Sequence, residues 1–200
     1  MRPRLIRAAL TAAALLAAQL AHAQDVPAPV MGDDGLYKSE WQQDTFKDLR
    51  EDMADAAAED RRLLLMVEQR GCIYCKKMHE EVFVVPEIDR LLREKYYVVQ
   101  INMFGDVEVT DFDGTALPEK EMVRRWGLLF TPTLMFFPAT PGDVPADATA
   151  TTAAVATMPG AFGTLTTLNL LNWVLEDGYT TDESFQKYHA RMLSTQASGE

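Results

Sequence analysis

The chain has 200 residues and carries 19 lysines and arginines against 30 aspartates and glutamates, a formal net charge of −11 at pH 7. This acidic balance argues against nucleic acid and anionic lipid as partners. The length suits a single domain, and enough apolar residues are present to build a core that folds without structural disulfides.

The first 23 residues have the features of a secretory signal peptide. Three arginines precede an apolar run over residues 8–20, and Ala21-His22-Ala23 forms an A-x-A cleavage site. The run is short and rich in alanine, which disfavours a membrane span; an uncleaved signal anchor is the alternative. We expect cleavage after Ala23, export to a bacterial periplasm, no stable membrane insertion, and a flexible segment over residues 24–40.

The next part of the chain predicts a helix, a buried strand and a second helix. Residues 38–62 have the pattern of a long helix, and residues 61–69 form a short apolar run framed by charge, which is typical of a buried strand. Gly71 ends this strand. Residues 72–83 then predict a helix, because four of them recur at helical spacing: Cys72, Cys75, Met78 and Val82.

The following segments alternate between helices and strands. Pro86 opens a helix over residues 86–95, and residues 96–104 predict the next strand. An acidic stretch alternates around Asp113-Gly114, which is a hairpin-turn signal, so we expect an acidic β-hairpin insertion. A short helix ended by Gly127 and an apolar strand follow, over residues 118–126 and 130–138.

The C-terminal part combines a connector with two helices. Residues 138–154 are rich in proline, alanine, threonine and aspartate, a composition typical of a mobile connector. An edge strand, the last helix of the domain and an additional amphipathic helix follow, over residues 155–162, 165–178 and 182–193. We expect one domain over residues 41–194 and a flexible tail over residues 195–200.

The two cysteines of the chain, Cys72 and Cys75, are separated by two residues. A disulfide that closes so short a loop removes little entropy from the unfolded chain, which disfavours a purely structural role. Structural zinc needs four ligands, and a c-type haem needs a histidine where Lys76 stands. Redox chemistry is the remaining interpretation. At the start of a helix, unpaired backbone N–H groups favour the Cys72 thiolate, while Cys75 lies one turn further in.

Residues 61–177 combine a strand, a C-x-x-C motif that opens a helix, a further β-α stretch, and Thr131-Pro132-Thr133 before an apolar strand. This order of elements resembles that of the thioredoxin-fold proteins. Three segments carry a closer similarity within that superfamily: GCIYCKKMHEEVF, the acidic insertion and RRWGLLFTPTLMFF. They are similar to the SoxW-type periplasmic thioredoxins associated with sulfur oxidation. The resemblance implies an α/β thioredoxin fold: a central mixed β-sheet flanked by helices, with an N-terminal helix, the hairpin insertion and an extra C-terminal helix.

The resemblance also implies roles for particular residues. Cys72 matches the nucleophilic cysteine and Cys75 the resolving one, so the redox-active disulfide is itself the reactive group, and no cofactor or metal is expected. Pro132 matches a proline whose cis peptide bond lies beside the disulfide, and Thr131 offers its backbone to an extended substrate. The Ile73-Tyr74 dipeptide between the cysteines departs from the Gly-Pro of thioredoxins, which leaves the reduction potential open.

The chain departs from the family at the buried acid that thioredoxins usually carry six residues before the first cysteine. Met66 stands at that position. Glu68 lies on the same face of the same strand, so it either replaces the acid or is an exposed residue at the strand end. The lysine often found near that acid is also missing, with Gln100 near the expected place, so proton handling is expected to differ.

Three functions remain open. The first is a thiol:disulfide oxidoreductase that reduces disulfides of periplasmic proteins and is recharged by a membrane reductase. The second is the same exchange in the opposite direction, a disulfide-forming oxidase. The third belongs to another class: a copper-handling module, with Cys72, Cys75 and His79 as ligands, since soft ligands select Cu(I). The scattered methionines, which are typical of core residues, argue against the third.

Overall fold

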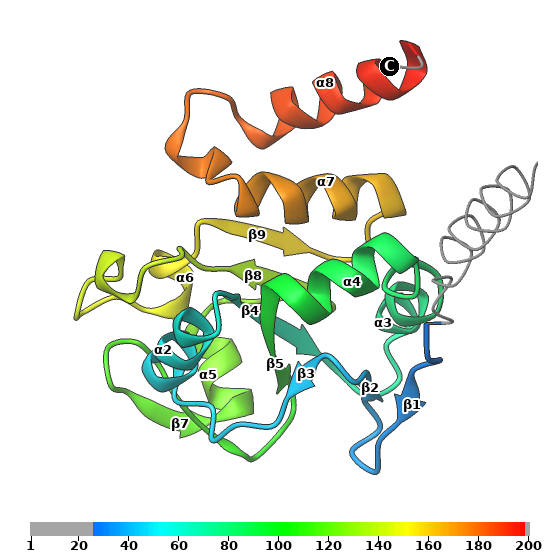
Figure 1. Ribbon diagram of the computed structural model, residues 1–200. Helices are drawn as coiled ribbons and strands as arrows, with labels where there is room; N and C mark the ends of the chain where they lie inside the picture. Colours follow the sequence, from blue (N-terminus) through cyan, green and yellow to red (C-terminus); the bar gives the residue numbers. More distant parts are fainter. Residues whose placement is uncertain (1–25, 199–200) are drawn as a thin grey trace, which may run out of the picture.

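The computed structural model describes residues 26–198, and the expected signal peptide lies outside them. Its centre is a five-stranded mixed β-sheet (Figure 1). The strand order is β3 (Gln42–Gln43), β5 (Tyr96–Asn102), β4 (Arg62–Glu68), β8 (Thr133–Phe136) and β9 (Ala156–Pro159). β3 and β5 run parallel to β4, whereas β8 and β9 are each antiparallel to their neighbours. The predicted α/β class with a central mixed sheet is confirmed.

Strand β4 occupies the middle of the sheet and is buried on both faces. All seven of its residues are buried, which explains why it is a continuous apolar run and not an alternating one. Leu64 and Met66 belong to one core, whereas Leu65 and Val67 belong to the other, because successive side chains of a strand alternate between its faces. The strand expected from this run forms, and it ends at Glu68.

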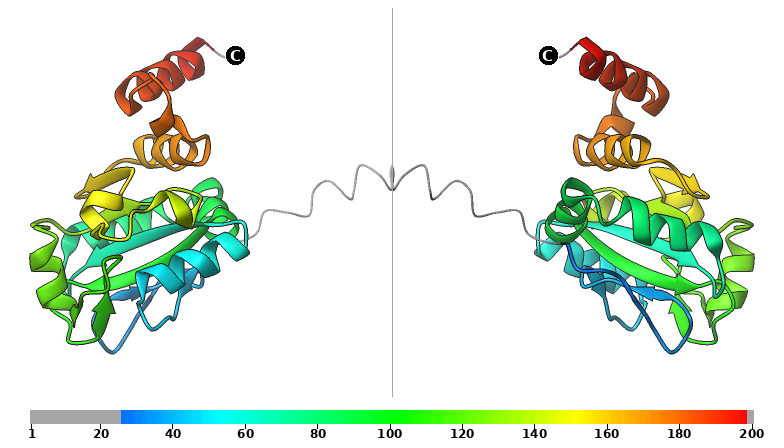
Figure 2. Two further views of the ribbon diagram at one scale, coloured as in Figure 1. Left: turned by 90° about the vertical axis from the view of Figure 1, so that its left-hand side faces the viewer. Right: turned by 90° about the vertical axis from the view of Figure 1, so that its right-hand side faces the viewer.

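Helices cover both faces of the sheet (Figure 2). One face carries α3 (Ile73–Lys77), its π-helical continuation η1 (Met78–Val82), α4 (Pro86–Lys95) and α7 (Thr164–Leu175). The other face carries α2 (Leu49–Ala58), α5 (Glu119–Arg125) and α6 (Ala150–Ala153). The longer helices bury apolar side chains against the sheet, so the sheet itself separates two cores.

The additional C-terminal helix is present as α8 (Phe185–Ser198), after the short η3 (Gly178–Thr180). It lies along the outer side of α7, away from the sheet (Figure 1). The helix includes most of the tail that was expected to be flexible from residue 195, because no residue up to Ser198 breaks it. Within residues 26–198, no helix combines the length and the apolar character needed to cross a membrane.

The N-terminal helix is present but shorter than predicted. Helix α2 begins at Leu49, where the Asp48 side chain accepts the N–H groups of Arg50 and Glu51 and caps the helix. The prediction was wrong for residues 38–48, which are not helical and include β3. Pairing of β3 with β5 in the central sheet outweighs the local helical propensity of this segment.

Residues 26–40, the described part of the segment that is expected to be flexible over residues 24–40, contain regular structure. β1 (Val30–Met31) and β2 (Tyr37–Lys38) pair antiparallel and form a two-stranded unit, called here the N-terminal ribbon. Gly35 in its turn has a φ of +76°, which suits glycine. Leu36 is buried, and the ribbon lies beside α3 (Figure 1). It thereby becomes part of the surroundings of the cysteines.

The acidic insertion is a hairpin, as predicted. β6 (Glu108–Thr110) pairs antiparallel with β7 (Ala116–Pro118), and Gly114 in the turn has a φ of +81°. Asp111 fastens the hairpin to the domain with a buried carboxylate. It accepts the backbone N–H groups of Phe112 and Ala150 at 2.8 Å and the indole N–H of Trp126 at 2.9 Å. A buried carboxylate with this many donors is well compensated for its lost hydration.

Residues 138–154 are packed, in contrast to the mobile connector that their composition predicts. They contain η2 (Pro141–Asp143) and α6, and Val144 and Ala148 are buried in the core that α2 covers. Thr149 and Thr152 form a reciprocal capping box at the start of α6. The prediction of a mobile connector from composition was wrong, because the small residues that are typical of linkers also fit closely packed turns.

Candidate active site

Cys72 and Cys75 are joined by a disulfide at the start of α3. Gly71, with a φ of +73°, turns the chain from β4 into this helix. Cys72 is the N-cap residue, and the backbone N–H of Cys75 donates to its Sγ at 2.9 Å. Cys72 is 9% exposed and Cys75 is 2% exposed. The residue at the start of the helix is therefore the more accessible of the two, as expected from its position.

The loop that contains Thr131 and Pro132 lies against the disulfide. The peptide bond between these two residues is cis, as the resemblance implies. The Thr131 carbonyl oxygen lies 3.5 Å from Cys72 Sγ, and the Thr131 hydroxyl donates to the same sulfur at 3.3 Å. These residues are 59 positions apart in sequence. They meet because β8, which follows Pro132, pairs with β4, which precedes Cys72.

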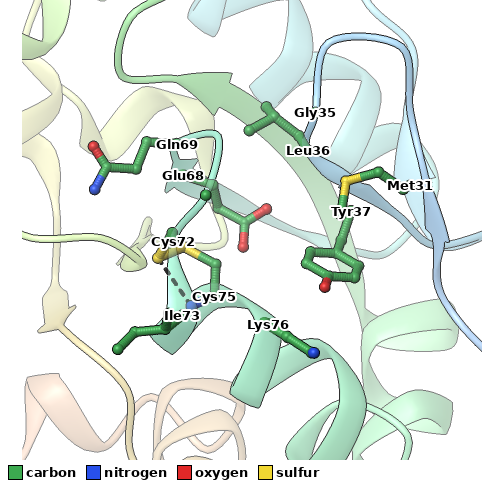
Figure 3. Close-up of a pocket in the computed structure, with 11 residues that line it drawn as sticks. Met31, Gly35, Leu36, Tyr37, Glu68, Gln69, Cys72, Ile73, Cys75 and Lys76 are labelled. Atoms are coloured by element: carbon green, nitrogen blue, oxygen red, sulfur yellow. Dashed lines mark hydrogen bonds between the residues drawn. A yellow bond between two sulfur atoms is a disulfide. The ribbon is translucent and has the colours of Figure 1, made fainter.

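Glu68 is buried at the end of β4. Its Oε1 lies 3.0 Å from His79 Nε2, and its Oε2 accepts a hydrogen bond from the Gln100 amide at 2.6 Å. Figure 3 shows the carboxylate pointing into the space between the disulfide and the Tyr37 ring. Of the two interpretations of Glu68, the exposed residue at the strand end is wrong, and the buried acid is the one observed.

A cavity of about 130 Å³ separates the disulfide from the N-terminal ribbon (Figure 3). Cys75 and Glu68 line it together with Leu36 and Tyr37. The volume is sufficient for a few water molecules beside Glu68 and Cys75. The ribbon was not predicted as part of this site, although Asp34-Gly35 is a turn signal that indicates a hairpin here.

His79 belongs to the network of Glu68 and not to the cysteines. Its Nε2 faces Glu68, and its Nδ1 lies 3.5 Å from the Ser39 hydroxyl. This arrangement gives no support to a copper site built from Cys72, Cys75 and His79. Across residues 26–198, no three His, Cys, Asp or Glu side chains gather in a way that could hold a metal ion.

The sequence profile of the thioredoxin-like domain family matches residues 49–150, just over half of the chain. The chain belongs to this family. The matched region runs from α2 to the start of α6, so both cysteines, Glu68 and the Thr131–Pro132 loop lie inside the thioredoxin-like domain. No curated protein matches the sequence.

Several solved structures are similar to this thioredoxin-like protein in fold. A thioredoxin-fold protein from Helicobacter pylori is 17% identical, with a TM-score of 0.48, over 68% of this chain and 81% of that one. A thioredoxin from Thermus thermophilus is 24% identical, with a TM-score of 0.48, over 66% and 86%. A DsbH oxidoreductase is 13% identical, with a TM-score of 0.38, over 72% and 90%. The family assignment rests on the sequence profile alone.

Exposed apolar side chains flank Cys72 and the Thr131–Pro132 loop of the thioredoxin-like domain in sequence. We call four of them the apolar collar: Ile73, Tyr74, Leu129 and Phe130, each more than half exposed. The first two follow Cys72 in sequence, and the last two precede Thr131, whose hydroxyl contacts Cys72 Sγ. Exposed apolar groups close together on a surface are typical of binding sites. Leu129 and Phe130 were not predicted as site residues, because their exposure cannot be read from an apolar run.

Proposed function

We propose that this protein is an exported, periplasmic thiol:disulfide oxidoreductase that reduces disulfides of partner proteins, in sulfur oxidation or in periplasmic redox maintenance. The observation that carries the proposal is the Cys72–Cys75 disulfide at a helix start, beside the Thr131–Pro132 loop and within the apolar collar. The similarity to SoxW-type thioredoxins supports the link with sulfur oxidation, and the signal-peptide pattern supports export.

The exchange begins at Cys72. In the reduced protein, the Cys72 thiolate attacks one sulfur of the partner's disulfide, a bond forms between the two sulfurs, and the partner's other sulfur leaves as a thiolate. The Cys75 N–H and the Thr131 hydroxyl both donate to Cys72 Sγ. Hydrogen bonds donated to a charged acceptor stabilise it, so they favour the reactive thiolate.

Cys75 completes the exchange. Its thiol proton passes through the cavity to Glu68, and its thiolate attacks Cys72, which forms the Cys72–Cys75 disulfide and releases the partner's second thiolate. Two electrons have then passed to the partner, and a membrane reductase restores the dithiol. The disulfide is the reactive group, so the proposed reaction uses no cofactor.

The direct test is the reduction of insulin, or of another protein disulfide, by the reduced mature chain from Gln24 onward in buffer without added metal. Reduction of the protein disulfide supports the proposal. A chain with an intact Cys72–Cys75 dithiol that reduces no protein disulfide would contradict it.

The direction of the exchange depends on the reduction potential of the Cys72–Cys75 pair. For a reductant, we expect a value nearer to about −270 mV, at the thioredoxin end of the known range, than to about −120 mV, at its oxidising end. Equilibration against a glutathione or thioredoxin couple measures this potential. A value above about −150 mV would favour the alternative, a disulfide-forming oxidase.

Replacing Leu129 or Phe130 by serine is expected to weaken the binding of protein substrates. Both side chains are exposed in the free protein, so the fold should tolerate the change. The lost apolar contact should raise the KM for a protein disulfide about tenfold and change the rate with a small aromatic disulfide by less than about twofold. Leu193→Ser, which removes an exposed apolar side chain from α8, is the matched control. Equal effects on both substrates would show that the collar does not bind the partner.

A further inference from the structure

His79 and Glu68 form a buried pair beside the cysteines. Both side chains are almost completely buried, and His79 Nε2 lies 3.0 Å from Glu68 Oε1 and 3.2 Å from Oε2. The Gln100 amide donates to Oε2 at 2.6 Å. Within the described part of the chain, His79 is the one basic side chain that pairs with Glu68. A buried carboxylate without donors is costly, and His79 and Gln100 are the side chains within hydrogen-bond distance of this one.

Packing holds the His79 ring toward Glu68. The ring stacks on Tyr37 at a centroid distance of 5.2 Å and on Trp41 at 6.1 Å, and the Phe83 ring meets it edge-on at 5.2 Å. On its other side, Nδ1 faces the Ser39 hydroxyl. The N-terminal ribbon and the segment after it therefore fix the ring, which leaves Nε2 directed at the carboxylate.

The two lysines near this cavity already have acidic partners. Lys38 donates to Gln100 Oε1 at 2.6 Å and pairs with Asp34 at 2.7 Å. Lys76, which lines the cavity, pairs with Glu80 at 3.9 Å. Lys38 thus orients the Gln100 amide toward Glu68, but neither lysine reaches the carboxylate.

We infer that His79 is a positioning residue for the second half of the exchange, in which Cys75 closes the disulfide. It donates its Nε2–H to Glu68 and holds the carboxylate directed into the cavity that Glu68 shares with Cys75. A proton acceptor has to lie within reach of the group that it deprotonates, directly or through one water molecule. The inference rests on the proposed exchange and assigns its second step to a buried Glu68–His79 pair.

The chemistry of this step separates it from the first. The proton of the Cys75 thiol moves to Glu68, the Cys75 thiolate forms a bond to Cys72 Sγ, and the bond from Cys72 to the partner breaks with its electron pair on the partner's sulfur. Glu68 then returns its proton to water through the cavity. The first attack, by Cys72, transfers no proton to Glu68, so a change at His79 should affect the second step alone.

Stopped-flow absorbance resolves the two steps with an aromatic disulfide that releases one coloured thiolate per step. The first release is bimolecular and the second is unimolecular, so the two rates are measured separately.

We expect His79→Leu to slow the second release about tenfold or more and to leave the rate of the first release within about twofold. His79→Gln, which keeps a side-chain N–H donor, should restore most of the rate. In a Glu68→Gln background, which is itself slow, His79→Leu should add no further loss.

Three kinetic results would overturn the inference. They are equal slowing of both releases by His79→Leu, an unchanged second release in that variant, and a His79→Gln variant as slow as His79→Leu. If His79→Leu does not fold because Glu68 is left unpaired, a proton–nitrogen correlation spectrum of the wild-type imidazole provides the test.

The spectrum shows which ring nitrogen of His79 carries the proton. A proton on Nε2 supports the inference. A ring protonated at Nδ1 alone would make Nε2 an acceptor from a protonated Glu68, and the inference would then be wrong. If the wild type shows no first release, the proposed exchange fails, whereas the spectrum still reports on the Glu68–His79 pair.

Discussion

A Cys75→Ser variant is expected to accumulate covalent complexes with its partner proteins, whereas Cys72→Ser should accumulate almost none. Cys72 is the more accessible residue and receives hydrogen bonds at its sulfur from the Cys75 N–H and the Thr131 hydroxyl, so it attacks first. Without the Cys75 thiol, nothing releases the partner.

Either substitution should lower the rate of protein-disulfide reduction about a thousandfold or more, because each removes a reacting atom. Non-reducing electrophoresis of periplasmic extracts, with mass spectrometry of the dithiothreitol-sensitive bands, measures the trapping and identifies the substrates.

The matched control is the variant that lacks both thiols, which should trap nothing. Trapping by Cys72→Ser as efficient as that by Cys75→Ser would show that the two sulfurs do not have separate roles. If neither single variant trapped a protein and both kept their reductase activity, thiol exchange would be the wrong mechanism.

An Asp52→Asn variant is expected to be more stable than the wild type in mildly alkaline buffer and equally stable in acid. Asp52 in α2 is 3% exposed, and its Oδ2 has no hydrogen-bond partner within the described residues. Burial raises the pKa of Asp52 to about 7, against the lowering effect of a hydrogen bond with Thr45 and with smaller upward contributions from the charges of Asp48, Asp55 and Glu51. Asparagine has nearly the same shape and needs no proton.

The sign of the effect follows from the protons that each state binds. Between pH 3.8, the ordinary pKa, and about pH 7, folded Asp52 holds a proton that the unfolded chain has lost. The free energy of unfolding therefore falls as the pH rises through this window and levels off above it. Because a tenfold difference in proton affinity is worth about 1.4 kcal/mol, Asp52→Asn should gain about 2 kcal/mol or more near pH 8. Urea unfolding of the wild type and the variant at pH 3.8 and near pH 8 measures the difference in the free energy of unfolding.

Asp55→Asn is the control for the lost negative charge, since Asp55 is an exposed residue of the same helix. Its effect should stay within about 0.5 kcal/mol at both pH values. An Asp52→Asn variant that gained no more than this control in alkaline buffer would show that Asp52 ionises in the folded protein without cost.

Local sequence patterns determined most of the domain. The helix predicted over residues 86–95 forms within those limits, and the hairpin forms around Gly114. Patterns of this kind succeed because apolar periodicity, proline at a helix start and glycine at a positive φ act over a few residues. The C-x-x-C motif indicated the Cys72–Cys75 pair at a helix start, whereas the resemblance to thioredoxin-fold proteins implied the neighbouring Thr131–Pro132 loop.

The failures lie where distant pairing or packing outweighs local preference. Residues 38–48 have a helical pattern, but β3 joins β5 in the central sheet. Residues 138–154 have the composition of a linker, but Ala150 donates its backbone N–H to the buried Asp111. In both segments the deciding partner lies tens of residues away, and no short window of sequence contains it.

Only the tertiary structure decided the surroundings of the disulfide. The sequence placed Glu68 on the correct face of its strand, but it left the burial of this residue open. Burial depends on groups that three other parts of the chain bring to the end of β4: Gln100 from β5, His79 from η1, and Tyr37 from the N-terminal ribbon. The charge state and direction of a buried acid depend on every group packed against it, and these groups assemble only when the chain has folded.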